Sequence, residues 1–334
     1  MKIALIKGDG IGPEISEVAT KVLKTLVPEM EFVEVEAGEQ ALAKHGNLLP
    51  EQTLNKIKEC GFGIKGPLNT PIGGGFKSIN VTLRQHFELY SNIRPVKSYP
   101  NASSRFSDVN IVLFRENVEG MYSGEGQISD GERAESKSIV TRKGSERIVR
   151  SAFEYAIKNG RQKVTIVHKA NILKSTSGLF LKTAQEVAQE YPQIKHETMI
   201  VDACAMNLVR NPANFDVIVT TNLFGDILSD LCAGLVGGLG LAPGANEGNG
   251  VFIVEAVHGT APDIAGQNKA NPTALILSCK MLLDRMGKAK ESEILEKALV
   301  KLYTEKTELT RDVGGNNGTQ EFGDALIREI KALQ

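Results

Sequence analysis

The feature of this 334-residue chain that most constrains its fold is a repeated alternation. Short apolar runs are each followed by a segment whose apolar residues have the spacing of a helix. The first run covers residues 2–6, and apolar side chains then follow at Ile15, Val18, Ala19 and Val22, the spacing of one helix face. The same order returns in three later pairs of predicted strand and helix: 164–167 with 177–191, 215–219 with 223–235, and 251–254 with 274–286. Repeated strand–helix units predict an α/β fold with a substantially parallel sheet.

Two turn-rich segments interrupt this pattern. Residues 98–104 are polar, and residues 237–244 are rich in glycine. A chain of this length is expected to form about two domains of roughly 150 residues each. We therefore interpret both segments as candidate crossings between domains.

Charge and cysteine content exclude several classes of protein. Lys and Arg (39) nearly balance Asp and Glu (40), so the chain is not a generally basic nucleic-acid-binding protein. No run approaches the length of a transmembrane helix, and the beginning of the chain turns polar too early for a signal peptide. Four widely spaced cysteines indicate a reducing compartment. We expect a cytoplasmic protein, or a processed mitochondrial one, that binds neither nucleic acid nor membranes.

The turn after the first predicted strand contains Gly8, Gly10 and Gly12. A Rossmann dinucleotide fingerprint needs a further glycine three residues after the second, and Pro13 stands there instead. The spacing therefore favours a tight turn without a phosphate-binding role. A nucleotide site of a different construction remains an alternative.

Three aspartates are candidate metal ligands. Asp226 and Asp230 lie four residues apart in a predicted helix, so they share one face, where like charges repel each other. A divalent cation such as Mg²⁺ would explain the pair, because it prefers carboxylate oxygens. Asp202 follows another apolar run. The alternative for the pair is an ordinary solvated helix face.

Three arginines near the ends of short apolar segments, Arg84, Arg94 and Arg115, could together bind a small polyanion. Taken singly, each is more often a surface residue or a structural ion-pair partner. Lys169 follows a predicted strand and could act as a base near a metal ion. Tyr122 carries little information alone.

These segments occur together in the order of a known family. The chain resembles the metal-dependent decarboxylating dehydrogenases of isocitrate and isopropylmalate from about residue 3 to about residue 325. The resemblance rests on GDGIGPE at 8–14, REN at 115–117, HKAN at 168–171, NLFGDILSD at 222–230 and HGTAPD at 258–263.

The resemblance implies a two-domain α/β fold with a non-Rossmann dinucleotide site. The large domain would comprise 1–98 and 241–334, with both termini and most of the NAD site, and the small domain would comprise 99–240. Members of the family are usually dimers with shared active sites. The segment from about 121 to 143 would form a clasp between subunits.

Substrate choice in the family lies between positions 71 and 84. Here Ser78 and Asn80 match the residues that bind the extra carboxylate of isocitrate, whereas isopropylmalate enzymes place apolar residues there. The resemblance therefore implies isocitrate as substrate and 2-oxoglutarate as product. Homoisocitrate, which would give 2-oxoadipate, remains an alternative, as does a non-catalytic regulatory subunit.

The segment from His258 onward implies the cofactor. Asp263 stands where NADP enzymes of the bacterial type carry a lysine that binds the 2′-phosphate, and a carboxylate repels phosphate, so NAD is favoured. By the same matching, the residues expected to contact NAD are Thr70, Asn171, His258, Gly259, Thr260, Ala261, Asp263 and Asn271.

The resemblance also assigns roles to the other candidates. Asp226 and Asp230, with Asp202 from the partner subunit, would bind Mg²⁺ or Mn²⁺. Lys169, also from the partner, would take the hydroxyl proton, and Tyr122 would donate a proton to C3. The arginines Arg84, Arg94 and Arg115 would hold substrate carboxylates.

Overall fold

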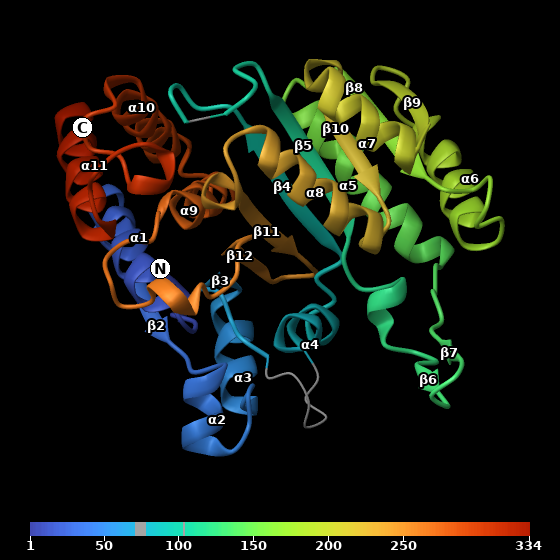
Figure 1. Cartoon of the computed structure of the whole chain (residues 1–334), viewed down its shortest axis with the longest axis horizontal. Coiled ribbons are helices and arrows are strands. Elements are labelled where there is room, and N and C mark those ends of the chain that lie inside the picture. The colour runs from blue at the N-terminus through green and yellow to red at the C-terminus, as the bar shows by residue number, and fades with distance from the viewer. Residues whose placement is uncertain (71–77, 103) are drawn as a thin grey trace.

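The computed structural model describes residues 1–70, 78–102 and 104–334. In these residues one ten-stranded sheet runs through the molecule in the order β2-β1-β3-β12-β11-β4-β5-β10-β8-β9 (Figure 1). The strands are β1 (Lys2–Ile6), β2 (Glu31–Glu34), β3 (Phe62–Lys65), β4 (Ser91–Lys97), β5 (Asn110–Glu116), β8 (Lys163–His168), β9 (Lys195–Ile200), β10 (Val217–Thr220), β11 (Pro243–Glu247) and β12 (Phe252–Ala256).

Most neighbouring strands of this sheet are parallel, and the antiparallel pairs lie at its centre, where β11 pairs with β12 and β4 and where β4 pairs with β5. The α/β class predicted from the alternation of runs is confirmed. Each predicted strand–helix pair is present, for example β8 followed by α6 (Thr176–Ala188) and β12 followed by α9 (Thr273–Arg285).

Helices cover both faces of the sheet (Figure 1). Their inward sides are apolar; in α1, for example, Ile15, Val18, Ala19 and Val22 are all buried, as the spacing predicted. The remaining helices are α1 (Gly12–Leu26), α2 (Glu39–His45), α3 (Glu51–Cys60), α4 (Ile79–His86), α5 (Arg142–Lys158), α7 (Val201–Arg210), α8 (Asn222–Leu235), α10 (Ala289–Glu305) and α11 (Thr319–Leu333). No helix among the described residues is long and apolar enough to cross a membrane.

The two ends of the chain lie together. In Figure 1 the last helix, α11, lies beside α1, and Gln334 donates a hydrogen bond to the carbonyl of Thr25 at 3.1 Å. Gly323 lets the two helices approach, because a Cβ there would stand 2.6 Å from a methyl group of Val18. This pairing is compatible with a large domain that holds both termini; the boundaries at 98 and 241 remain a prediction.

A small hairpin projects from the molecule (Figure 1). It pairs β6 (Ile128–Ser129) with β7 (Ala134–Glu135) in an antiparallel two-stranded sheet of its own. Its side chains are exposed, including Ile128 at 64%. The hairpin lies within the segment 121–143 for which a clasp is expected.

The glycine turn 8–12 packs against two other loops. Gly10 has a φ of +59°, and a Cβ there would stand 2.1 Å from the carbonyl oxygen of Thr260, which accepts a hydrogen bond from the amide of Ile11 at 2.9 Å. A Cβ at Gly8 would similarly meet the carbonyl of Pro67. Glycine is required here for the close approach of neighbouring backbones, in keeping with the tight-turn interpretation.

Candidate active site

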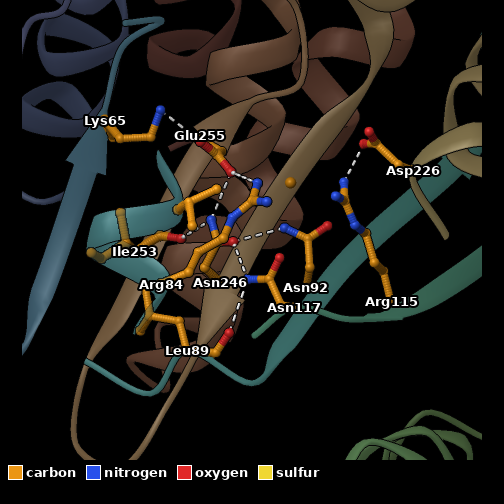
Figure 2. Close-up of polar contacts among 12 residues, drawn as sticks. Lys65, Arg84, Leu89, Asn92, Arg115, Asn117, Asp226, Asn246, Ile253 and Glu255 are labelled. Carbon is orange, nitrogen blue, oxygen red and sulfur yellow. Dashed lines mark hydrogen bonds and ion pairs between the residues drawn. The ribbon is translucent and has the colours of Figure 1, made fainter. Parts of the chain in front are cut away.

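Three central strands carry a row of polar side chains on one face of the sheet. Asn246 on β11 lies opposite Asn92 on β4, and Asn92 lies opposite Arg115 on β5. Residues directly opposite each other in neighbouring strands point to the same face. The Asn92 amide donates to Asn246 Oδ1 at 2.8 Å (Figure 2). The sheet itself therefore aligns part of the site.

Arg115 joins this row to helix α8. Its guanidinium forms an ion pair with Asp226, and its Nε donates to Asn222 Oδ1 at 2.9 Å. Tyr122 donates its hydroxyl proton to the other oxygen of Asp226 at 2.5 Å. Thus three of the predicted site residues, Arg115, Tyr122 and Asp226, come together from distant parts of the chain.

The ionisable groups around Asp226 shift one another's pKa values. Burial and the neighbouring guanidinium groups of Arg84 and Arg94 lower the pKa of Arg115 to about 10. Burial alone would raise the pKa of Asp226, but Arg115 and the Tyr122 hydroxyl hold it below its usual range. Burial and the hydrogen bond to Asp226 raise the pKa of Tyr122. At neutral pH the carboxylate is therefore charged and the phenol keeps its proton.

Arg94 links the same helix to β4. Its Nε donates to Asn92 Oδ1 at 2.7 Å, and its Nη1 contacts the Ser229 hydroxyl and lies 3.5 Å from Asp230. Burial raises the pKa of Asp230, and Asp226 adds to the rise. As the four-residue spacing predicted, Asp226 and Asp230 share one side of α8, and Arg94 contacts both.

Arg84, the third predicted arginine, belongs to a buried ionic cluster that sequence reasoning missed (Figure 2). Glu255 on β12 lies 2.6 Å from Lys65 Nζ and 3.6 Å from Arg84, and it accepts from the Asn246 amide at 2.8 Å. Burial opposes the charge of Glu255, but Lys65 and Arg84 hold its pKa well below the usual range. A single carboxylate inside the apolar run 251–256 was the signal available in the sequence.

Two predicted residues form a separate pair. Lys169, after β8, forms an ion pair with Asp202 in the first turn of α7 at 2.6 Å. Neither is linked by a hydrogen bond or ion pair to Asp226 or Asp230 in the described part of the chain. Among the same residues, no three His, Cys, Asp or Glu side chains gather in a group able to hold a metal ion. One chain therefore brings together two of the three predicted metal ligands.

The start of α4 carries the predicted substrate residues. Ser78 caps this helix by accepting from the amide of Val81 at 3.4 Å. Thr70 accepts from the amide of Ile79, also at 3.4 Å. Asn80 Oδ1 is buried and has no hydrogen-bond partner in the described residues. The intervening positions 71–77 of the expected specificity segment lie outside those residues.

The loop after β12 contains most of the predicted cofactor residues, among them Gly259 and Thr260. His258 has one ring nitrogen 3.0 Å from the Gly259 carbonyl, and its Nε2 is buried without a partner in the part that the structure describes. Burial lowers the pKa of His258, so its ring is neutral at pH 7. Ala261 has a left-handed backbone, with φ of +41°.

Asp263 and Asn271 lie further along the same connection between β12 and α9, whereas Asn171 comes from another part of the chain. Asp263 is exposed in a short 3₁₀ turn, Pro262–Ile264. Asn271 is buried and donates to Asp312 at 2.9 Å. Asn171 is exposed in the loop that follows Lys169, which is distant in sequence from the loop after β12. Asp312 is a neighbour that the sequence alone did not single out.

Comparisons with known proteins identify the family of the chain. Residues 2–326 match the family model described as isocitrate/isopropylmalate dehydrogenase. The crystal structure of isocitrate dehydrogenase from Methylococcus capsulatus is 49% identical, with a TM-score of 0.95 and 99% of each chain covered.

Two further relatives differ in what their names describe. A mitochondrial catalytic subunit of NAD isocitrate dehydrogenase from Arabidopsis thaliana is 47% identical, and the match covers 98% of this chain and 87% of the relative. Homoisocitrate dehydrogenase of Methanocaldococcus jannaschii is 44% identical, with 99% and 98% covered. With a family match over nearly its whole length, this chain belongs to the isocitrate/isopropylmalate dehydrogenase family.

Proposed function

We propose that this protein oxidises and decarboxylates isocitrate to 2-oxoglutarate and CO₂ with NAD as hydride acceptor. The observation that carries the choice of substrate is the polar start of α4, where the hydroxyl of Ser78 and the Nδ2 of Asn80 offer hydrogen-bond donors to a carboxylate. The buried Oδ1 of Asn80, which has no partner in the described residues, can only accept a hydrogen bond and would take a donor such as the substrate hydroxyl. Asn80 lies four residues before Arg84 on α4, so the two share a helix face.

The arginines support a substrate with several carboxylates. Arg84, Arg94 and Arg115 are all buried, and Arg84 and Arg94 both depress the pKa of Arg115. Mutual repulsion of this kind is relieved when an anion binds among them, and guanidinium groups suit carboxylates. A tricarboxylate such as isocitrate offers three such groups, and Ser78 and Asn80 would hold the one that isopropylmalate lacks.

Two carboxylates in each chain fit a hard divalent cation. Asp226 and Asp230 share one side of α8, and the Asp230 side chain is 55% exposed. Their oxygens are the donors that Mg²⁺ and Mn²⁺ prefer. Asp202 of a second copy would complete the set. When bound, such a cation acts as a Lewis acid toward negative charge that develops on substrate oxygens.

Two side chains of this chain can move the protons that the reaction requires. Lys169, paired with Asp202, would accept the hydroxyl proton of the substrate as hydride leaves C2. Tyr122 keeps its proton at neutral pH and is held by Asp226, so it can donate that proton to C3 after CO₂ departs. The two roles need Lys169 and Tyr122 at one site, although they are separate within one chain.

A homodimer would bring them together. Helices α7 and α8 expose large apolar side chains, with Ile227 at 57% and Met206 at 50% exposed, joined by Val209 and Leu223. Clustered exposed apolar residues mark protein interfaces. Asp202 begins α7 and Asp226 lies on α8, so a second copy on these helices could place its Lys169 and Asp202 beside the first copy's Asp226.

NAD is favoured by the loop after β12. Asp263 is exposed there, and its negative charge would repel the 2′-phosphate of NADP while accepting hydrogen bonds from ribose hydroxyls. The Nε2 of His258, which is partnerless within the described part of the chain, is available to a ligand in this loop. NAD, when bound, accepts the hydride that leaves C2 of the substrate.

Product analysis tests the reaction. The purified chain with isocitrate, NAD and Mg²⁺ should form NADH, CO₂ and 2-oxoglutarate in equal amounts. Removal of the cation with EDTA should abolish the reaction, and added Mn²⁺ should restore it. NADH formed without CO₂ would contradict decarboxylation, and full activity in EDTA would contradict the metal site.

A further inference from the structure

The central strands carry a second set of side chains on the face opposite the candidate active site. Successive residues of a strand point to opposite faces. On β4, Asn92 and Arg94 belong to the candidate active site, whereas Ile93 and Pro95 between and after them line a separate cavity. On β12, Glu255 faces the site and Phe252 lines the cavity. The sheet thus separates this cavity from the candidate active site.

This cavity, which we call the rear cleft, has a volume of about 940 Å³. It lies between α5 on one side and α9 with the start of α10 on the other, over β4, β5, β11 and β12. Small-molecule sites in proteins commonly measure about 300–1,000 Å³. The rear cleft is therefore large enough for a small organic ligand.

One face of α5 lines the rear cleft with polar side chains. The lining positions are three, four, seven, eight and eleven residues after the first, the spacing of a single helical stripe. The buried stripe of α5, with Ile148, Val149 and Phe153, is apolar, and this second stripe is polar and half-buried or exposed. The members of the second stripe are Arg147, Arg150, Ser151, Glu154, Tyr155 and Lys158.

The rear cleft has an excess of positive charge. Seven Lys or Arg residues and four Asp or Glu residues line it. Three of the carboxylates are already paired with lining cations, in the pairs Glu296–Lys97, Asp284–Lys280 and Glu247–Arg285. Two lining arginines pair with carboxylates outside the cleft, Arg150 with Glu190 and Arg161 with Asp216. Among the described residues, Arg147, Lys158 and Glu154 are left without an ion pair, a net excess of one positive charge. The balance favours an anionic ligand over a cationic one.

Arg147 supplies the most specific feature. Its guanidinium lies over the ring of Tyr90, 5.0 Å from the ring centre, and its Nε is buried without a hydrogen-bond partner in the described residues. Arg285 lies over Phe252 at 5.7 Å in the same way. A buried N–H of a charged group without an acceptor is costly. An anionic oxygen in the cleft would satisfy it, and the half-buried rings of Tyr90 and Tyr155, which line the cleft, offer surfaces for an aromatic group.

We propose that the rear cleft is a binding site for a small organic anion that carries an aromatic ring. Its anionic group would accept hydrogen bonds from Arg147, and its ring would pack among the aromatic side chains of the lining. This site is distinct from the proposed substrate and NAD sites, because none of the residues predicted for those sites lines it. The proposal does not depend on which substrate the active site takes.

Isothermal titration of the protein with 1-naphthyl phosphate tests this proposal. The expected dissociation constant is below about 1 mM. Inorganic phosphate, which has the charge alone, and 1-naphthol, which has the ring alone, should each bind at least tenfold more weakly. Absence of 1-naphthyl phosphate binding to the wild-type protein would overturn the proposal.

Variants then locate the binding. Arg147→Gln should weaken 1-naphthyl phosphate tenfold or more, because the charge at the partnerless N–H is lost. Arg142→Gln is the matched control: it removes a guanidinium from the same helix, but Arg142 pairs with Glu186 and does not line the cleft. It should change the affinity less than twofold. Equal binding by Arg147→Gln and wild type would place the ligand elsewhere and refute the assignment.

A second variant guards against misfolding of the first. Ser151 lines the cleft from α5 one helical turn after Arg147, so Ser151→Phe would place a bulky side chain beside Arg147 without removing charge. It should also abolish binding while circular dichroism shows a folded protein. A folded Ser151→Phe protein that binds as tightly as wild type would contradict the site.

Discussion

Gly225 on α8 lies against the side chain of Arg115 on β5, and a Cβ at position 225 would stand only 2.6 Å from Arg115 Cγ. The absence of a side chain there lets Arg115 pass the helix and reach Asp226. The arrangement of the candidate active site therefore depends on the small size of Gly225, a residue without a functional group.

Gly225→Ala should displace Arg115 and lower kcat/KM for isocitrate at least tenfold. Overpacking of this kind typically also costs about 1–3 kcal/mol in free energy of unfolding. Gly234→Ala on the same helix is the control, since a Cβ there meets nothing within 4 Å. It should leave activity unchanged and leave stability unchanged or slightly raised. Steady-state kinetics and urea unfolding measure both effects. If Gly225→Ala and Gly234→Ala have the same kcat/KM and the same free energy of unfolding, the proposed role of Gly225 is wrong.

Tyr122→Phe removes the proton proposed for C3 and leaves the ring. The expected loss in kcat is on the order of 10²–10⁴-fold, the usual contribution of a general acid or base. Tyr191→Phe, at a tyrosine stacked on Phe153 away from the site, is the control and should retain activity. A loss below about threefold for Tyr122→Phe would remove this residue from the mechanism.

Lys169→Met should be as inactive as Tyr122→Phe, and mixing the two variants tests whether sites are shared between subunits. In a mixed dimer, one site would carry both substitutions and the other neither. After subunit exchange about a quarter of wild-type activity should therefore return. If each site lies within one chain, every site of the mixture retains one substitution, and no activity returns.

The burial of Glu116 predicts that the free energy of unfolding depends on pH. It is 4% exposed on β5, and its oxygens accept from the amides of Val118 and Glu119 at 3.0 and 2.8 Å. Burial raises its pKa from the ordinary 4.5 to about 7, with Glu119 adding to the rise and Arg147 opposing it. The folded protein therefore binds this proton more tightly than the unfolded chain does.

The stability contributed by Glu116 is accordingly full below about pH 4.5 and falls as the pH rises to about 7. The free energy of unfolding of wild type, relative to Glu116→Gln, should fall by on the order of 3 kcal/mol across this window. Urea unfolding at several pH values measures it, with the exposed Glu132→Gln as a control for loss of one charge. A constant difference between wild type and Glu116→Gln would contradict the raised pKa.

Sequence reasoning predicted the elements well because their periodicity is local. The helix spacing of Asp226 and Asp230 placed both on one side of α8, and the strand at 2–6 formed as expected. These patterns depend only on neighbours in the chain, so a single sequence suffices to find them.

The contacts of those residues depend on strand order, which periodicity does not determine. Glu255 meets Lys65 because β12 lies next to β3, although about 190 residues separate the two in sequence. Within the apolar run of β12, Glu255 gave no sign that its partners were Lys65 and Arg84. The pairing of Arg115 with Asp226 likewise required the three-dimensional fold, whereas the resemblance supplied the residues themselves.

The substrate preference of the wild-type enzyme tests the central claim most directly. Initial rates with Mg²⁺ should be measured on isocitrate, homoisocitrate and 3-isopropylmalate, each with NAD and with NADP. We predict that kcat/KM is at least about tenfold higher for isocitrate with NAD than for any other pair. A preference for homoisocitrate or isopropylmalate would contradict the roles of Ser78 and Asn80, and no turnover with any pair would indicate a regulatory protein instead.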